Sequence, residues 1–333
     1  SFGNQTISFS SLLFLWAAAA AVVIIKKSFG IAKWAGPADS MYSAHQLNVP
    51  FNIKQGLAST LAAFASVSGG ASVGQYGPIV HFGATVGIIT SKLQLRKRLG
   101  FNRLPREIYL ACGVAAAISA GFNAPIAGII FAHEAILRHF SVRAIAPITV
   151  SSIAASSVGG YLFPHTATFK IDAAAPALAE VVPFLVILSP IFAITAIAFM
   201  VSIRYSTKLA TSLSVNPTLL PFIGATACGL VGLFVPQALG LGVSNINDMI
   251  SGEYLVPLLI SVLIAKIFMT SACIGFGVFG GVFSPALFIG VAAGALATKL
   301  LVAIGFNDIA SVITVAAMAA VSASVIGAPL SAV

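Results

Sequence analysis

The stretch from residue 181 to 203 is a mostly apolar run without a single charged side chain. A helix that crosses a bilayer needs about 20 mostly apolar residues, and around ten segments of the chain approach that pattern. Only 8% of the residues are charged and the mean hydropathy is +1.04, whereas soluble domains carry about 25% charged residues. The sequence therefore predicts an all-α polytopic membrane protein.

Several apolar segments are too short to cross a bilayer alone, for example residues 108–120 and 124–137, and glycine and proline interrupt them. Lipid cannot satisfy the backbone groups that such interruptions free, so they occur only where protein or a water-filled cavity supplies partners. These segments predict re-entrant half-helices, which are typical of channels and transporters.

The pattern GxxxPxxxxGxxxG occurs twice, at Gly74, Pro78, Gly83 and Gly87 and at Gly281, Pro285, Gly290 and Gly294. Proline is tolerated in a first helical turn, and the glycines before it let backbone approach a ligand closely. The first N–H groups of a helix have no internal partner and carry the positive end of its dipole. Two such helix starts that face one point would bind an anion.

The candidate anion contacts are the backbone N–H groups of Tyr76, Gly77, Val282 and Phe283. Around them, the candidate pore residues are Gly74, Gln75, Tyr76, Pro78, His81, Gly280, Gly281, Ser284 and Pro285. The second copy has no Lys or Arg beside it, which favours weak binding and rapid release of the ion. The alternative is that these glycines only allow close helix packing.

A second signature also recurs in the same order. Asn123-Ala124-Pro125-Ile126 follows the first copy, and Gly327-Ala328-Pro329-Leu330 follows the second. We interpret this as an internal duplication, with halves at residues 1–163 and 184–333 and a linker at 164–183. In transporters such halves are commonly inverted, and interrupted helices form the site near the midplane.

The net charge is +9, and the densest basic group is confined to one connecting loop, at Lys92, Arg96, Lys97, Arg98, Arg103 and Arg106. The positive-inside rule predicts a cytoplasmic loop. Its charges either raise the anion concentration at a pore mouth or anchor the chain to lipid head groups. A basic face with interleaved aromatic residues is absent, which argues against nucleic acid as a partner.

The sequence offers no cofactor or metal motif. Cys112, Cys228 and Cys273 are widely spaced inside apolar segments, which predicts packing residues. His133-Glu134 begins like an HExxH zinc motif, but position 137 is leucine. We therefore expect neither a cofactor nor a bound metal, and no enzyme activity.

The stretch Gly281-Val282-Phe283-Ser284-Pro285 resembles the GxFxP signature of the CLC chloride channels and chloride/proton antiporters. The stretch Gly74 to Pro78 resembles the GREGP signature of the same family, and GFNAPIAGIIF, at residues 121–131, is similar to its following helix. The resemblance implies a homodimer, inverted halves and one pathway for chloride or a similar anion per subunit. A multi-pass protein of a prokaryotic inner membrane is expected. The apolar pattern runs to Val333, so we expect the sequence to be truncated at both ends, with the family's pore tyrosine beyond it.

Three positions depart from the family. The third signature, GSGIP, is poorly matched near Ala35, Gly36 and Pro37, with Ala35 in the place of the serine that donates to the anion. Tyr76 replaces the gating glutamate, and Ala135 replaces the inner proton glutamate. The resemblance then implies anion conduction without proton coupling, with Tyr76 as a plug, a hydroxyl donor or a filler. Ala35, Gly36 and Pro37 remain weaker candidates for anion contacts.

Three ionisable residues leave alternatives open. His133 and Glu134 could form a substitute proton path, or Glu134 could bond to backbone or to Arg138. His81 could line the pore and make conduction depend on pH, or it could be a buried, hydrogen-bonded histidine. An anion/proton antiporter that uses these residues, and a non-conducting relative with a scaffold role, are the alternative functions.

Overall fold

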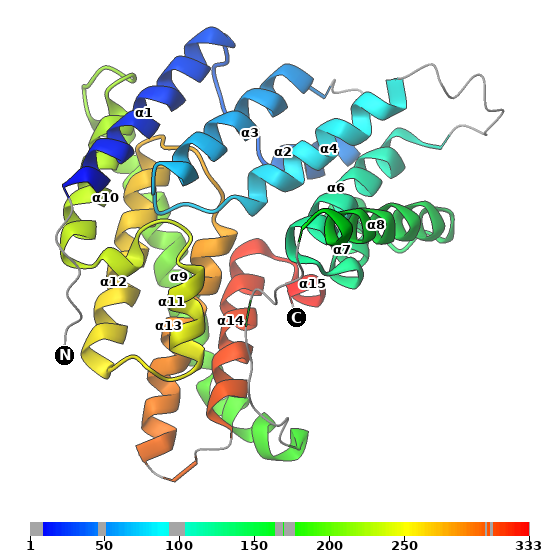
Figure 1. Cartoon of the computed structure of the whole chain (residues 1–333). Coiled ribbons are helices and arrows are strands. Elements are labelled where there is room, and N and C mark those ends of the chain that lie inside the picture. The colour runs from blue at the N-terminus through cyan, green and yellow to red at the C-terminus, as the bar shows by residue number, and fades with distance from the viewer. Residues whose placement is uncertain are drawn as a thin grey trace. The chain divides into compact units, whose positions relative to one another are not determined.

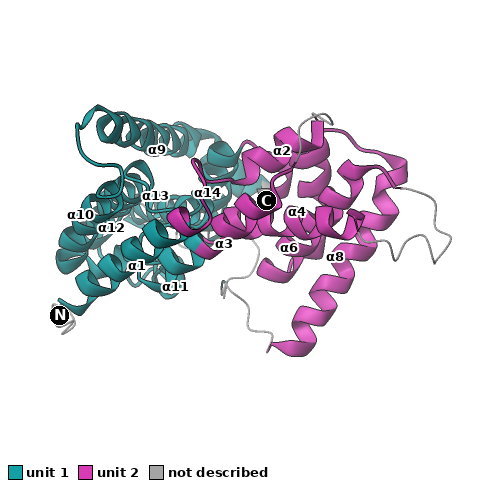
Figure 2. Cartoon of the chain, turned by 90° about the horizontal axis from the view of Figure 1, so that it is seen from above, with its two compact units in different colours: residues 1–25, 62–74, 169–326 teal, residues 26–61, 75–168, 327–333 magenta. Residues whose placement is uncertain are grey.

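The structure is a computed structural model that describes residues 9–45, 51–92, 104–163, 169, 177–303, 305–306 and 309–332. Within these ranges the secondary structure is helical apart from one isolated β-bridge (Figure 1). This confirms the predicted all-α class. The chain forms two compact units, each built from separate segments of the sequence (Figure 2).

Unit 1 consists of residues 1–25, 62–74 and 169–326. It contains most of α1 (Ser10–Ser28) and the end of α3 (Ile53–Ser68). Its remaining helices are α9 (Leu178–Ser212), α10 (Leu220–Phe234), the 3-10 turn η2 (Pro236–Ala238), α11 (Val243–Ile250), α12 (Val256–Gly275), α13 (Phe283–Ala303) and α14 (Ala310–Ile326).

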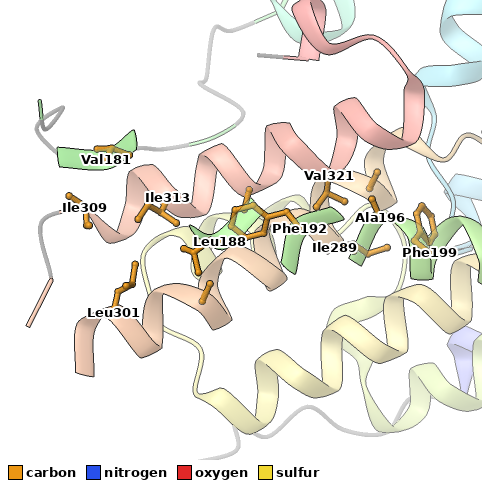
Figure 3. Packing of buried hydrophobic residues seen from close by; sticks show 13 residues of the cluster. Val181, Leu188, Phe192, Ala196, Phe199, Ile289, Leu301, Ile309, Ile313 and Val321 are labelled. Atoms are coloured by element: carbon orange, nitrogen blue, oxygen red, sulfur yellow. The ribbon is translucent and has the colours of Figure 1, made fainter. Parts of the chain in front are cut away.

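The core of unit 1 lies where α9, α13 and α14 pack together (Figure 3). Its buried side chains include Phe192 and Phe199 of α9, Ile289 of α13 and Ile313 of α14. Lipid tails are as apolar as these side chains, so close packing rather than transfer out of water stabilises such contacts. This packing holds α13, whose first residues belong to the second motif.

The outer surface of α9 is apolar as well. Val186, Ile187 and Ile194 are 65 to 70% exposed, which suits contact with lipid. Five helices of the described residues are long and apolar enough to cross a membrane, namely α1, α8 (Val142–Leu162), α9, α12 and α13. The chain is therefore a polytopic membrane protein, as predicted.

Unit 2 consists of residues 26–61, 75–168 and 327–333. Its helices are α2 (Pro37–His45), the start of α3, α4 (Tyr76–Lys92), α6 (Arg106–Phe122), α7 (Pro125–Phe131), the π-helix η1 (Ala132–Leu137), α8 and α15 (Pro329–Ala332). The segment predicted to be interrupted, residues 124–137, is a short α-helix that continues as a π-helix. Irregular helix of this kind often marks functional sites.

The compact units cut across the predicted halves, so the division at residues 1–163 and 184–333 stays a prediction about duplication. Helix α9 already begins at Leu178, inside the predicted linker 164–183. Most of that linker lies outside the described residues, as do Arg96, Lys97, Arg98 and Arg103 of the basic loop.

Candidate functional site

The first residues of the two motifs pair with each other in unit 1. Gly74 and Gly281 form an antiparallel bridge, in which Gly74 N donates to Gly281 O at 2.7 Å and Gly281 N donates to Gly74 O at 2.5 Å. These residues hold equivalent positions in the two copies. Equivalent residues that pair antiparallel are related by a local two-fold axis, so the two copies run in opposite directions where they meet.

Both motifs begin a helix at the predicted place. Helix α4 starts at Tyr76 and α13 starts at Phe283, so Pro78 and Pro285 each fall in a first helical turn. A proline there costs no helical hydrogen bond, because the first N–H groups have no intrahelical acceptor.

The last two glycines of each motif serve helix packing. A Cβ at Gly83 would overlap backbone of Gly113 on α6, and Gly87 meets α6 in the same way. Gly290 and Gly294 lie equally close to α14. The packing interpretation therefore holds for these four glycines in both copies.

The glycines of the turns themselves have another constraint. A Cβ at Gly74 would lie 3.0 Å from both Gly281 O and Ser284 Oγ, and one at Gly280 would overlap Val73. These positions need glycine because two stretches of backbone meet there. Val282 and Phe283 follow directly after the bridge, with Ser284 as the second residue of α13. The hydroxyl of Ser284 is buried and has no hydrogen-bond partner among the described residues.

Tyr76 lies in unit 2, where its ring stacks on Phe122 with a centroid distance of 3.8 Å and an interplanar angle of 20°. Phe122 is the last residue of α6, and a Cβ at the adjacent Gly121 would be 3.5 Å from the Tyr76 ring. The phenol is thus held against the end of α6. Gln75 and Gly77 flank it in the turn that begins α4.

The turn at Ala35, Gly36 and Pro37 has its amides occupied by side chains of unit 2. Ala35 N donates to Ser59 Oγ at 2.8 Å, and Gly36 N donates to Asp39 Oδ2 at 2.7 Å. Pro37, the first residue of α2, has no N–H to offer. These hydrogen bonds weigh against an anion contact through the amides of this turn.

His81 is a buried histidine with one hydrogen-bond partner. Its Nδ1 and Ser40 Oγ share a hydrogen bond at 2.6 Å, and its ring stacks on Phe51 at 5.1 Å. The side chain is 2% exposed. Nε2 has no partner among the described residues and faces the backbone of Gly56. The structure thus agrees with the alternative of a buried, hydrogen-bonded histidine, in which Nδ1 is hydrogen-bonded and Nε2 is not.

Glu134 accepts hydrogen bonds from backbone N–H groups, which is one of the alternatives predicted from the sequence. Its Oε1 accepts from Leu330 N and its Oε2 from Ser331 N, both at 2.8 Å, so the carboxylate caps α15. His133 Nδ1 is 2.9 Å from Ile129 O of its own helix, and its ring stacks on Phe140. Glu134 therefore has a structural role within unit 2, whereas Nε2 of the buried His133 has no partner among the described residues. Ala135 beside them is buried.

One functional candidate was missed in the sequence. Lys266 lies in the middle of α12 and is completely buried. Its Nζ donates to Ala238 O at 3.0 Å and to Gly240 O at 2.6 Å, and lies 4.8 Å from the centre of the Phe288 ring. The available signal was a single lysine inside an apolar segment, since such a charge is costly in a bilayer.

Lys266 belongs to a network that reaches the first motif. Ala238 O also accepts from Ser72 Oγ at 3.2 Å, and Gly240 N donates to Gly70 O at 3.0 Å. This network fixes the segment that leads into Gly74. It therefore helps to hold Gly74 in the position in which it pairs with Gly281.

The described residues contain no group of three or more His, Cys, Asp or Glu that could hold a metal ion. Cys228 and Cys273 are buried, and both pack in the core formed around α10 and α12. This location agrees with the packing role predicted for them.

Residues 17–333 match the sequence model of the voltage gated chloride channel family. The chain is 30% identical over 278 residues to the H+/Cl− exchange transporter ClcA of Vibrio cholerae, which covers 80% of this chain and 58% of that protein. It is 25% identical over 265 residues to the voltage-gated ClC-type chloride channel ClcB of Escherichia coli, with 78% and 61% covered. The chain thus spans less than two thirds of the length of these relatives.

Two solved structures share the fold. One is a slow cyanobacterial Cl−/H+ antiporter, with a TM-score of 0.83, 19% identity, and 97% of this chain and 77% of that chain covered. The other is a CLC-type fluoride/proton antiporter, with a TM-score of 0.67, 18% identity, and 98% and 88% covered. At this level of identity the likeness concerns the fold alone.

Proposed function

Since the chain belongs to the voltage gated chloride channel family, the CLC family, we propose that it transports chloride or a similar small anion across a membrane. The observation that carries this proposal is the antiparallel pairing of Gly74 with Gly281. It fixes the turn from which α13 starts. The relatives named as a chloride channel and as a chloride exchanger support the substrate class.

The start of α13 has the electrostatics that a transported anion needs. Its first amides carry the positive end of the helix dipole, equivalent to roughly half a charge. The turn from Gly280 to Pro285 contains no basic residue. Partial charges of this kind attract an anion and still release it, whereas a full positive charge at the same place would slow its departure. The start of α4 offers the same kind of amides at Tyr76 and Gly77.

We propose further that transport is not coupled to protons. Tyr76 stands where the family has its gating glutamate, and a phenol stays neutral near pH 7. Ala135 stands at the second glutamate position and carries no ionisable group. The neighbouring Glu134 is occupied as the cap of α15. A homodimer in a prokaryotic inner membrane is the assembly and location that we propose from family membership.

A flux assay tests this function. The purified protein is placed in liposomes loaded with chloride, and valinomycin carries potassium out. We expect chloride to leave without proton movement, while chloride-loaded liposomes that contain no protein should lose none. Absence of chloride flux would contradict the proposal and favour a non-conducting scaffold.

A proton-coupled antiporter is the second candidate. It is favoured by Nε2 of the buried His81, which has no partner among the described residues and could take a proton in place of the missing carboxylates. A chloride gradient that drives proton uptake would support it, and an H81Q variant should then lose the proton flux. Flux that stays constant from pH 5 to 8 would remove any role of His81 as a sensor.

A further inference from the structure

The hydroxyl of Ser284 is a buried polar group that lacks a hydrogen-bond partner. The side chain is 5% exposed, and its Oγ has no partner among the described residues. Ser284 is the second residue of α13, a helix of 21 residues. A buried hydroxyl without an acceptor destabilises the protein. An acceptor at the start of α13 would remove that cost.

The surroundings of Ser284 indicate what the acceptor is. In the first turn of α13, Pro285 has no N–H and Ala286 N donates to Val282 O at 3.0 Å. The first-turn amides that lack an intrahelical acceptor are therefore those before Pro285. A hydroxyl beside such amides, at the positive end of a helix dipole, favours an anion.

The bridge places the hydroxyl in the turn region. A Cβ at Gly74 would lie 3.0 Å from Ser284 Oγ and 3.1 Å from Ser284 N, so both donor atoms of Ser284 face the backbone of Gly74. Gly281 O, which lies on the same side, already accepts from Gly74 N. The hydroxyl does not share this acceptor, and it remains a donor without an acceptor among the described residues.

From this geometry we propose that Ser284 is an anion-coordinating residue, whose hydroxyl donates a hydrogen bond to the anion held at the start of α13. The inference depends on the proposed function and identifies a side-chain ligand for it.

The test is the chloride dependence of thermal unfolding, measured on the purified full chain in sodium chloride and in sodium gluconate. A ligand that binds only the folded state raises its stability in a saturable way. We expect S284A to weaken chloride binding by about tenfold or more, since a hydrogen bond to an ion is worth at least about 1.4 kcal/mol, the equivalent of tenfold. In gluconate S284A should unfold at or above the temperature of the unsubstituted protein, because the variant removes a buried group without a partner.

Ser271 supplies a matched control. It is 2% exposed, and its hydroxyl also lacks a partner among the described residues, but it lies within α12 away from a helix start. S271A should leave chloride affinity unchanged. S284T keeps a hydroxyl and should retain chloride binding, whereas S284V has a similar shape without one and should lose it. The last pair carries the test if S284A does not fold.

The outcomes separate the two proposals. If the unsubstituted protein responds to chloride and S284A responds with the same affinity, the role of Ser284 is wrong while the proposed function stands. Equal losses in S284A and S271A would also overturn the role of Ser284. If the unsubstituted protein neither binds nor transports chloride, the proposed function is wrong, and the inference falls with it.

Discussion

The stack of Tyr76 on Phe122 should control how Tyr76 affects anion flux. The ring centroids are 3.8 Å apart, with 20° between the ring planes, and aromatic pairs in proteins are in general worth about 0.5–1.5 kcal/mol beyond buried area. At an RT of about 0.59 kcal/mol, this energy changes the ratio of stacked to unstacked orientations by about 2- to 13-fold. F122A should release the Tyr76 ring into other orientations and lower chloride flux by at most about 13-fold, the upper end of that range.

A double-mutant cycle in the liposome assay checks this coupling. Y76A removes the ring, so its flux should equal or exceed that of the unsubstituted protein. The F122A substitution should then have no further effect in the Y76A background. F131A is the control, because Phe131 is a different phenylalanine of unit 2, buried at 9% exposure, and its effect should not depend on residue 76. If F122A lowers flux equally with and without the Tyr76 ring, the stack does not position Tyr76 and the reasoning is wrong.

Three further predictions concern stability, measured by thermal unfolding of the purified protein. G83A should destabilise by about 1–3 kcal/mol, because its methyl group would overlap backbone of α6, whereas G121A, whose methyl would make an ordinary contact with the Tyr76 ring, should change stability far less. E134A should cost about 1–3 kcal/mol, chiefly through the part-buried amide of Ser331, and E134Q should cost less because it keeps one acceptor; equal losses would contradict the cap. The free energy of unfolding of K266A should be about 2–5 kcal/mol lower than that of K266M, since methionine fills the volume that alanine leaves empty. Equal free energies of unfolding would show that the surrounding side chains move in to fill that volume.

Much of the fold could be predicted because bilayer physics restricts the choices. Apolar runs required helices, and the duplicated glycine and proline positions marked two helix starts at Tyr76 and Phe283. The interrupted segment before Glu134 was also predictable, since Gly and Pro break its apolar pattern. Each of these is a local signal, in which neighbouring residues determine the outcome.

Contacts between distant residues could not be predicted in the same way. Glu134 caps a helix start about 200 positions later, at Leu330 and Ser331, and the sequence around Glu134 gives no sign of this partner. The amide of Ala35 likewise donates to Ser59 of α3. Hydrogen bonds of this kind depend on which helices pack together, and a single sequence does not encode that choice in any short pattern.

The two copies of the motif have the same residues at the positions that packing constrains, and they have different residues at the positions proposed to contact a ligand. The equivalent residues Gly74 and Gly281 pair with each other, and the later glycines pack against a neighbouring helix in both copies. Between these fixed positions, Tyr76 corresponds to Phe283, and Gly77 corresponds to Ser284. The turns at residues 74–78 and 281–285 therefore carry one hydroxyl each, on Tyr76 in the first and, one position later, on Ser284 in the second. If Ser284 coordinates the anion as proposed, its hydroxyl is the side-chain group that distinguishes the second copy from the first, in which the equivalent residue is Gly77.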